Sequence, residues 1–274
     1  MADSPDSLPL AEQPPDDQAL LARAFWLLLD HGRPVEVGVL ADALQREPAA
    51  VAAAVDRLEQ AGLTRRDPAG RLLGSHGLSV APTHHELVID GRRRWTWCAY
   101  DAVGILGALE ADGQVRSRSP HSGTLIELTF DAGQPAATDA VVFMAEEPCR
   151  SVIDDWCPLV NLFEHDQAAA AWARQHGISG AAQPVAQVTR LGAAARPGVV
   201  VGTRDGVARL LPAAPGRMVH RARIARPGDI CFRRGHLPWD LRRADVAALA
   251  LRFPLQNRNS GPGGPRTAPA AVRR

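Results

Sequence analysis

A run of three helical segments and a hairpin opens the chain and limits the folds that it can adopt. Residues 18–32, 37–45 and 48–62 carry apolar side chains at helical spacing, and glycine stands where the first and third segments end. The stretch LTRRDPAGRLLG follows directly and is typical of two short strands joined by a tight turn. This order predicts a winged-helix-like domain over residues 18–80.

Many winged helices bind DNA, so nucleic acid is the first partner to consider for this domain. Between Gln18 and Val80, however, seven arginines are balanced by seven acidic residues. The third helix carries Asp56 and Glu59 against a single Arg57, whereas phosphate binding needs a basic face. We therefore expect this domain to pack or dimerise, and nucleic acid is an unlikely partner.

The next part of the chain mixes strand and helix patterns, which predicts the α+β class. A helix is predicted where the sequence reads QAAAAWARQHG, with its end at the glycine. Short apolar runs predict strands over residues 78–90, 124–130, 140–144 and 184–189. We expect a mixed strand and helix catalytic domain over residues 81–192.

Both ends of the chain differ from this body in composition. Residues 1–17 are polar and rich in proline, and we expect them to be disordered. Residues 193–274 hold 16 arginines against 4 aspartates, a balance of +12, whereas the whole chain has a net charge of only +1. This Arg/Pro-rich extension is predicted to be irregular and poorly ordered.

The sequence favours a protein of the cytoplasm. No apolar run reaches the roughly 20 residues needed to cross a bilayer, and the acidic, proline-containing start is unlike a secretory signal. We therefore expect a soluble protein with no membrane partner. The four cysteines are few and irregularly spaced, so we expect thiols and not a disulfide scaffold.

The stretch WTWCAYDAVG at residues 95–104 places a cysteine beside a carboxylate. Thr96 is a plausible N-cap for a helix that begins at Trp97, which would put Cys98 in the first turn. The unpaired N–H groups at a helix N-terminus favour a thiolate over a thiol. Asp101 follows three residues later on the same helical face, close enough to exchange a proton with Cys98.

The stretch DDWCPLVNLF offers a second cysteine with an aromatic neighbour. Cys157 follows Trp156 and precedes Pro158, and a residue before proline is biased away from helical geometry towards an extended turn. Cys98 and Cys157 could converge from separate elements on one apolar pocket. Two thiolates and the carboxylate of Asp101 would suit a soft metal ion.

These cysteines allow three other interpretations. A structural zinc site needs four ligands, usually in close pairs, and the adjacent His84 and His85 would point to opposite faces of a strand. A cysteine hydrolase would need a histidine base, for which only His121 or His165 is available. A redox dithiol formed by the two cysteines would leave Asp101 and the tryptophans without a role.

Taken together, WTWCAYDAVG and DDWCPLVNLF downstream of a winged-helix-like domain resemble the organomercurial lyases, also called alkylmercury lyases. The resemblance runs from about Ala19 to about Leu191. The second cysteine of that family, in a turn before an apolar run, is matched by Cys157 and LVNLF. The WCAxD motif of that family is matched by Trp97, Cys98, Ala99 and Asp101.

The resemblance implies protonolysis of a carbon–mercury bond, which gives a hydrocarbon and Hg(II). It implies that Cys98 and Cys157 are catalytic, capture the organomercurial substrate and hold the Hg(II) product, and that Asp101 delivers a proton to the leaving carbon. No organic cofactor is implied. Cellular thiols or a mercuric reductase would accept the metal. The aromatic residues expected to line the substrate pocket are Trp95, Trp97, Tyr100 and Trp156.

Two alternatives remain from the sequence. One is a mercury- or metal-responsive regulator that uses its winged helix on DNA and its cysteines as a switch. The other is an inactive relative of the lyases.

Overall fold

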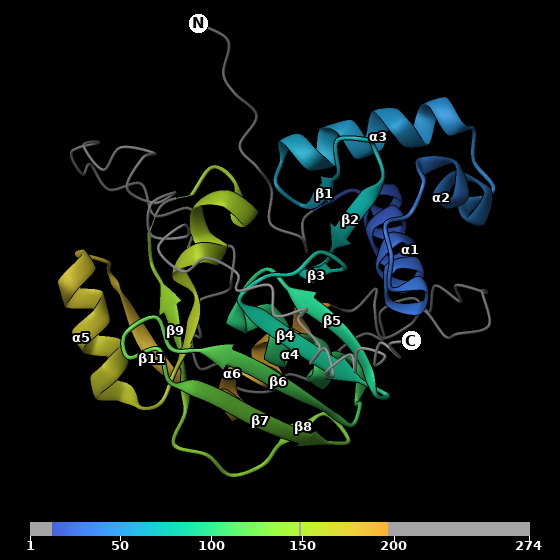
Figure 1. The fold of residues 1–274 in the computed structure, drawn as a ribbon. Coiled ribbons are helices and arrows are strands. Elements are labelled where there is room, and N and C mark those ends of the chain that lie inside the picture. The colour runs from blue at the N-terminus through green and yellow to red at the C-terminus, as the bar shows by residue number, and fades with distance from the viewer. Residues whose placement is uncertain (1–12, 148, 197–274) are drawn as a thin grey trace, which may run out of the picture. The chain divides into compact units, whose positions relative to one another are not determined.

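The computed structural model describes residues 13–147 and 149–196, and Figure 1 shows their fold. The described part begins with three helices, α1 (Pro15–His31), α2 (Val37–Leu44) and α3 (Pro48–Gln60). The first begins at Pro15, three residues before the Gln18 at which the sequence predicted order to start. Proline fits this position because the first residues of a helix need no N–H partner.

The three N-terminal helices bury one face each, as their apolar spacing predicts. Leu20, Leu21, Phe25 and Leu28 of α1 are at most 1% exposed. Gly32 ends α1 in the left-handed conformation, with φ 63°, and its N–H donates to the carbonyl of Leu28. The predicted hairpin follows as β1 (Thr64–Arg66) and β2 (Leu72–Ser75), which pair antiparallel.

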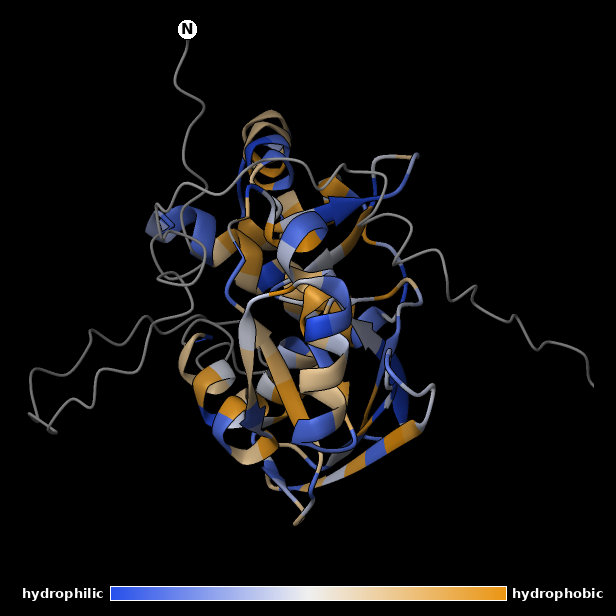
Figure 2. Ribbon diagram, turned by 90° about the vertical axis from the view of Figure 1, so that its left-hand side faces the viewer, coloured by the Kyte–Doolittle hydropathy of each residue, from blue (hydrophilic) through white to orange (hydrophobic). Residues whose placement is uncertain are grey.

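The larger sheet has eight strands in the order β1-β2-β3-β5-β4-β6-β7-β8, and every neighbouring pair is antiparallel. Its strands therefore start in the N-terminal hairpin and continue into the rest of the chain. Along β7 exposed and buried residues alternate strictly, and Figure 2 shows polar and apolar bands along the helices and strands. The remaining strands are β3 (Leu78–Ser79), β4 (His85–Ile89), β5 (Arg92–Thr96), β6 (Gly113–Arg118), β7 (Leu125–Asp131) and β8 (Gln134–Pro135).

The smaller sheet has three antiparallel strands in the order β10-β9-β11. Its strands are β9 (Val141–Ala145), β10 (Asn161–Phe163) and β11 (Gly180–Pro184), and helix α5 (Asp166–His176) packs against all three. The predictions of strands near 124–130 and 140–144 and of a helix ending at Gly177 are confirmed. The α+β class, with antiparallel sheets, is confirmed as well.

The strand predicted over residues 184–189 is wrong. Only Pro184 belongs to β11, and Val185–Ala194 form helix α6. Val185, Val188, Thr189 and Gly192 are buried, at intervals of three and four residues, so the apolar spacing is helical. In the short stretch PVAQVT the two patterns are hard to distinguish, and Pro184 is equally suited to precede a helix.

Helix α4 (Ala99–Leu109) lies at the centre of the described fold and crosses α6 at very short range. It contacts β4, β5 and β6 of the large sheet and β9 and β10 of the small one. A Cβ atom added at Gly104 of α4 would lie 2.8 Å from the Cα of Gly192 in α6 and 2.6 Å from Nη1 of Arg196. Glycine at both positions lets the two backbones touch.

The described part of the chain holds no helix with both the length and the apolar character needed to span a membrane. The expectations for residues 1–12 and 197–274 fall outside the described residues. The domain boundaries at residues 80 and 192 stay predictions.

Replacement of Gly104 by alanine should lower the free energy of unfolding by about 1–3 kcal/mol, because the new methyl group must push α4 away from α6. Gly38→Ala is the matched control, since nothing lies within 4 Å of a Cβ at this helical glycine. It should raise the free energy of unfolding by about 0.5–1 kcal/mol. Urea denaturation of both variants tests this, and equal shifts in one direction would contradict a close helix crossing.

Candidate active site

Cys98 stands at the junction of β5 and α4. Its backbone is extended, with φ −150° and ψ 174°, and it is the N-cap of α4, which begins at Ala99. The sequence predicted a helix from Trp97 with Thr96 as its cap; instead Thr96 ends β5, where its hydroxyl donates to the Cys98 carbonyl at 3.0 Å. Because β5 pairs as a strand up to Thr96, the helix begins at Ala99, two residues later than predicted.

Asp101 lies in the first turn of α4, directly beside Cys98. The Cys98 thiol donates to Oδ2 of Asp101, with 3.0 Å between sulfur and oxygen. Asp101 is only 7% exposed. Gly77, in the turn between β2 and β3, has φ 87° and lies so close to the Asp101 carboxyl group that a Cβ there would overlap it. Glycine is therefore required at this position for two reasons.

Cys157 is carried by two short irregular helices, η2 (Val152–Trp156) and η3 (Cys157–Leu159). The Ser151 side chain caps η2 by accepting from the Asp154 N–H. The predicted extended turn is wrong, because Cys157 has φ −55° and ψ −39°. Pro158 is tolerated here because it stands in the first turn of η3, where a backbone N–H would have no helical partner to bond.

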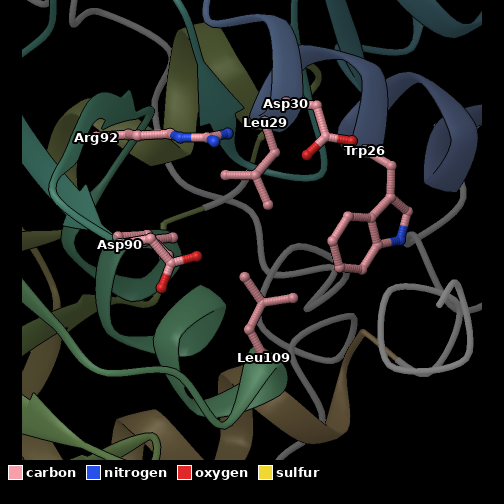
Figure 3. A pocket seen from close by; sticks show the side chains of 7 residues that line it. Trp26, Leu29, Asp30, Asp90, Arg92 and Leu109 are labelled. Carbon is pink, nitrogen blue, oxygen red and sulfur yellow. The ribbon is translucent and has the colours of Figure 1, made fainter. Parts of the chain in front are cut away.

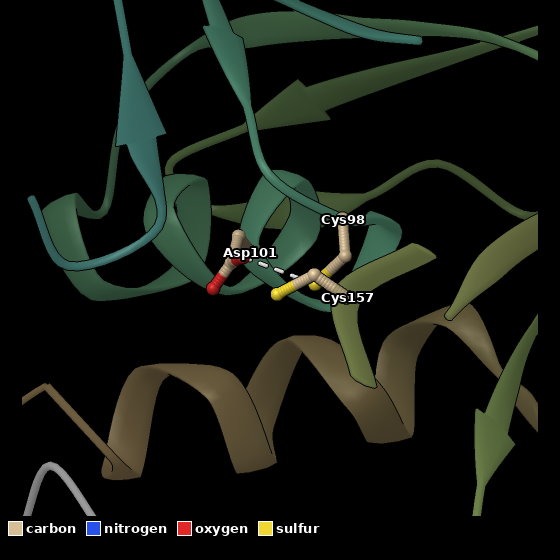
Figure 4. A group of neighbouring side chains, drawn as sticks. All are labelled: Cys98, Asp101 and Cys157. Atoms are coloured by element: carbon tan, nitrogen blue, oxygen red, sulfur yellow. Dashed lines mark hydrogen bonds between the residues drawn. The ribbon is translucent and has the colours of Figure 1, made fainter. Parts of the chain in front are cut away.

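The structure brings Cys98, Asp101 and Cys157 together, although 59 residues separate the two cysteines (Figure 4). Their two sulfur atoms and a carboxylate oxygen all lie within 4.8 Å of one another. Cys98 is 0% and Cys157 2% exposed, and both are free thiols. Within residues 13–147 and 149–196, this is the one group of three such side chains placed to hold a metal ion.

Arg196 completes the site and was not identified from the sequence. It lies 4% exposed, two residues beyond the end of α6, and its Nη2 forms an ion pair with Oδ1 of Asp101. Its Nη1 donates to the carbonyl of Gly192 at 2.7 Å and its Nε to that of His76 at 3.3 Å. The sequence had assigned this residue to the Arg/Pro-rich extension.

Two of the four predicted pocket aromatics lie together next to this group. The rings of Tyr100 and Trp156 meet edge to face at 5.9 Å, and the Arg196 guanidinium lies 5.3 Å from the centre of the Tyr100 ring. Trp95 and Trp97 follow the strand alternation, so they point away from the buried face that carries Thr96. Trp97 packs over Gly74 of β2 instead.

Burial controls the protonation of the site. It raises the pKa of the Cys98 thiol well above the ordinary value, helped by hydrogen bonding to Cys157 and by the charge of Asp101. Burial likewise raises the pKa of Cys157. The expectation of a Cys98 thiolate is therefore wrong for the resting site, because the cost of burying a charge exceeds the effect of the helix N-terminus. Burial also raises the pKa of Asp101, and Arg196 opposes that shift.

No histidine of the described residues has a ring nitrogen within this group of ligand atoms. His84 is exposed and His85 buried, as opposite faces of a strand require, and burial lowers the pKa of His85 to about 3. The His85 Nδ1 lies 2.9 Å from the Ser117 hydroxyl. His121 and His165 are exposed, and His165 caps α5 through its Nδ1. The geometry thus offers neither a fourth zinc ligand nor a histidine base at the thiols.

A separate cavity of about 200 Å³ lies between α1, the turn from β4 to β5 and the end of α4 (Figure 3). Trp26, Asp30, Asp90, Arg92 and Leu109 are among its lining residues, and no member of the thiol and carboxylate group lines it. The three side chains of the candidate active site are buried and do not line this cavity.

Comparison with known proteins identifies the family. The family model for alkylmercury lyase matches residues 78–196. An alkylmercury lyase of Streptomyces lividans is 32% identical over 176 residues, which cover 63% of this chain and 80% of that protein. The chain belongs to the alkylmercury lyase family. An alkylmercury lyase of Pseudomonas putida is 31% identical over 167 residues, which cover 59% of this chain and 76% of that protein.

A solved structure supports the fold independently. The mercury-bound form of MerB2 superposes with a TM-score of 0.64 at 23% identity, covering 69% of this chain and 94% of that one. The part matched by the alkylmercury lyase model, residues 78–196, contains both cysteines, Asp101 and Arg196. The family match therefore ends at the residue that pairs with Asp101.

Cys98 and Cys157 should resist alkylation by iodoacetamide at pH 7.4, because their raised pKa values leave little thiolate and burial blocks access. The rate should rise as pH increases above 9, the ordinary cysteine value. Peptide mass spectrometry measures modification at each cysteine, and the same protein in urea is the control. Rapid modification of folded Cys98 at pH 7.4 would contradict a buried thiol.

Proposed function

We propose that this protein cleaves the carbon–mercury bond of organomercurials by protonolysis, with Cys98 and Cys157 as mercury ligands and Asp101 as proton donor. One observation carries the proposal. In a member of the alkylmercury lyase family, two buried thiols and a carboxylate place their ligand atoms within 4.8 Å of one another. Thiolate sulfur is the softest ligand that a protein side chain provides, and mercury is a soft metal.

The protonated resting site supplies the protons that the reaction consumes. One thiol displaces the thiolate that accompanies the substrate, R–Hg–SR′, and its proton leaves on R′SH. The second thiol gives its proton to Asp101 and its sulfur binds mercury. Asp101 then protonates the carbon, the carbon–mercury bond breaks, and the products are R–H and Hg(II) held by two thiolates. The 3.0 Å hydrogen bond from Cys98 to Asp101 is the path for such a transfer.

The environment of the site supports the remaining parts of the proposal. Tyr100 and Trp156 offer apolar ring surface for the organic group, whereas Trp95 and Trp97 point away from the buried face that carries Thr96. The chemistry uses side chains and the substrate's own metal, so it needs no organic cofactor. Cellular thiols or a mercuric reductase accept Hg(II), and the protein acts in the cytoplasm.

Residues 18–80 act in this proposal as a winged-helix-like packing domain and not as a DNA-binding one. Asp56 and Glu59, the acidic residues of α3, form ion pairs with Arg66. This face of the helix is therefore not a row of basic side chains that could bind phosphates. The Ser75 hydroxyl of β2 donates to the Leu21 carbonyl of α1 at 2.8 Å, which ties the helices to the sheet.

Cys98→Ser, Cys157→Ser and Asp101→Asn should each lower hydrocarbon release by at least about 100-fold, because each removes a ligand or the proton donor. The measurement is benzene from phenylmercuric salt with excess thiol, by headspace gas chromatography. Asp131→Asn, an exposed residue of β7, is the control and should retain the wild-type rate.

A Cys98→Ser or Cys157→Ser variant with full activity would contradict the assignment of that residue. Wild-type protein that binds mercury at two thiols and releases no benzene would contradict the proposed lyase. It would favour the inactive relative, or the metal-responsive regulator if the protein also shifted a specific DNA.

A further inference from the structure

The Asp101 side chain is held from two sides by different groups. One oxygen, Oδ2, accepts a hydrogen bond from the Cys98 thiol, and the other, Oδ1, forms an ion pair with Nη2 of Arg196. A carboxyl group free to rotate about its side-chain bonds would point at the thiols only part of the time. With Oδ1 fixed, Oδ2 stays directed at Cys98.

Arg196 is itself fixed to the backbone at two distant points. Its Nη1 donates to the Gly192 carbonyl at the end of α6, and its Nε donates to the His76 carbonyl in the turn between β2 and β3. The next residue along that turn, Gly77, packs against the Asp101 carboxyl group. The guanidinium therefore joins α6, the β2–β3 turn and Asp101 in one arrangement, in which Arg196 is 4% and Asp101 7% exposed.

The glycines at the crossing of α4 and α6 make room for this arrangement. A Cβ at Gly104 would lie 2.6 Å from Nη1 of Arg196, and one at Gly192 would lie 3.3 Å from the same atom. The guanidinium thus fills a space that exists only because both residues lack a side chain. This arrangement requires an arginine at position 196, because arginine has five donors in a planar fork whereas lysine has three on a single nitrogen.

We infer that Arg196 is a positioning residue for the cleavage step, which fixes the Asp101 carboxylate with Oδ2 directed at the mercury-binding thiols. This inference rests on the proposed lyase activity. Arg196 contacts neither thiol, so its loss should leave capture of the organomercurial by Cys98 and Cys157 intact. What should slow is the delivery of the proton to carbon, because the donor is no longer held in place.

The test separates capture from cleavage in a single turnover. Wild-type protein, Arg196→Gln and Arg196→Lys are each mixed with one equivalent of phenylmercuric salt. Uptake is measured by intact-protein mass spectrometry and benzene by headspace gas chromatography. Arg196→Gln should take up the mercurial fully and release benzene roughly 10- to 100-fold more slowly than wild type. Arg196→Lys keeps the charge and should lie between the two.

Arg94→Gln is the matched control. Arg94 is also a buried arginine, 7% exposed, and it also donates to backbone carbonyls, those of Leu29 and Arg93. It touches none of the three reacting side chains. Its replacement should lower the melting temperature without changing the rate of benzene release per molecule that has captured the mercurial. If Arg196 had a merely structural role, Arg196→Gln would likewise lower the melting temperature without changing the rate of benzene release.

The outcomes distinguish the inference from the proposed function. Wild-type protein that releases no benzene would overturn the lyase and the role of Arg196 with it. Cleavage by wild type together with an equal rate in Arg196→Gln or Arg196→Lys, expressed per captured mercurial, would overturn only the role of Arg196. Should Arg196→Gln fail to fold, Arg196→Lys alone decides, because an unchanged rate in that variant contradicts the required geometry.

Discussion

Asp101 is a carboxylate removed from water, and a buried charge persists in a folded protein only where other groups replace its hydration. Arg196 and the Cys98 thiol do so here, one on each oxygen. This requirement explains features that lie far from one another in the sequence. Gly77 must lack a side chain beside the carboxyl group, and Gly104 and Gly192 must let α4 and α6 touch so that the guanidinium reaches it. The ion pair thus links α4, α6 and the β2–β3 turn.

The same burial decides the resting state of the two cysteines. A helix N-terminus favours a thiolate, but removal from water favours the thiol, and at Cys98 the second effect is larger. In the proposed protonolysis this is useful, since each turnover would consume two protons and the resting thiols would supply them. A site with preformed thiolates would bind mercury as well, yet it would have no proton to deliver to carbon.

The sequence predicted the elements whose signals are local. Pro48, Gly32 and Gly177 mark helix ends that the structure reproduces, and the alternation along β7 identifies a strand with one buried face. The two cysteine motifs were enough to suggest the three side chains that meet. The local conformations of Cys98 and Cys157 were mispredicted, because strand pairing by β5 and the packing of η2 and η3 are tertiary effects.

Arg196 could not be found from local signals either. It lies 95 residues from Asp101, in a chain whose basic residues are all arginine and at the start of a segment that holds 16 of them. Its burial depends on the crossing of α4 and α6, and the strand predicted over 184–189 hid the helix that makes this crossing. Once α6 is recognised as a helix, Gly192 falls on its buried face, and Arg196 follows four residues later, just beyond the helix end.

The two cysteines are held by elements of different regularity. Cys98 caps α4, which is buried on nearly all sides, whereas Cys157 ends the five-residue η2 as its C-cap and begins the three-residue η3. Such short π and 3₁₀ turns have poorer hydrogen-bond geometry than an α-helix. The Arg65–Asp154 ion pair that links η2 to β1 is solvent-exposed, and exposed pairs add little stability. The backbone that carries Cys157 is therefore less regular than the one that carries Cys98, although both thiols are buried.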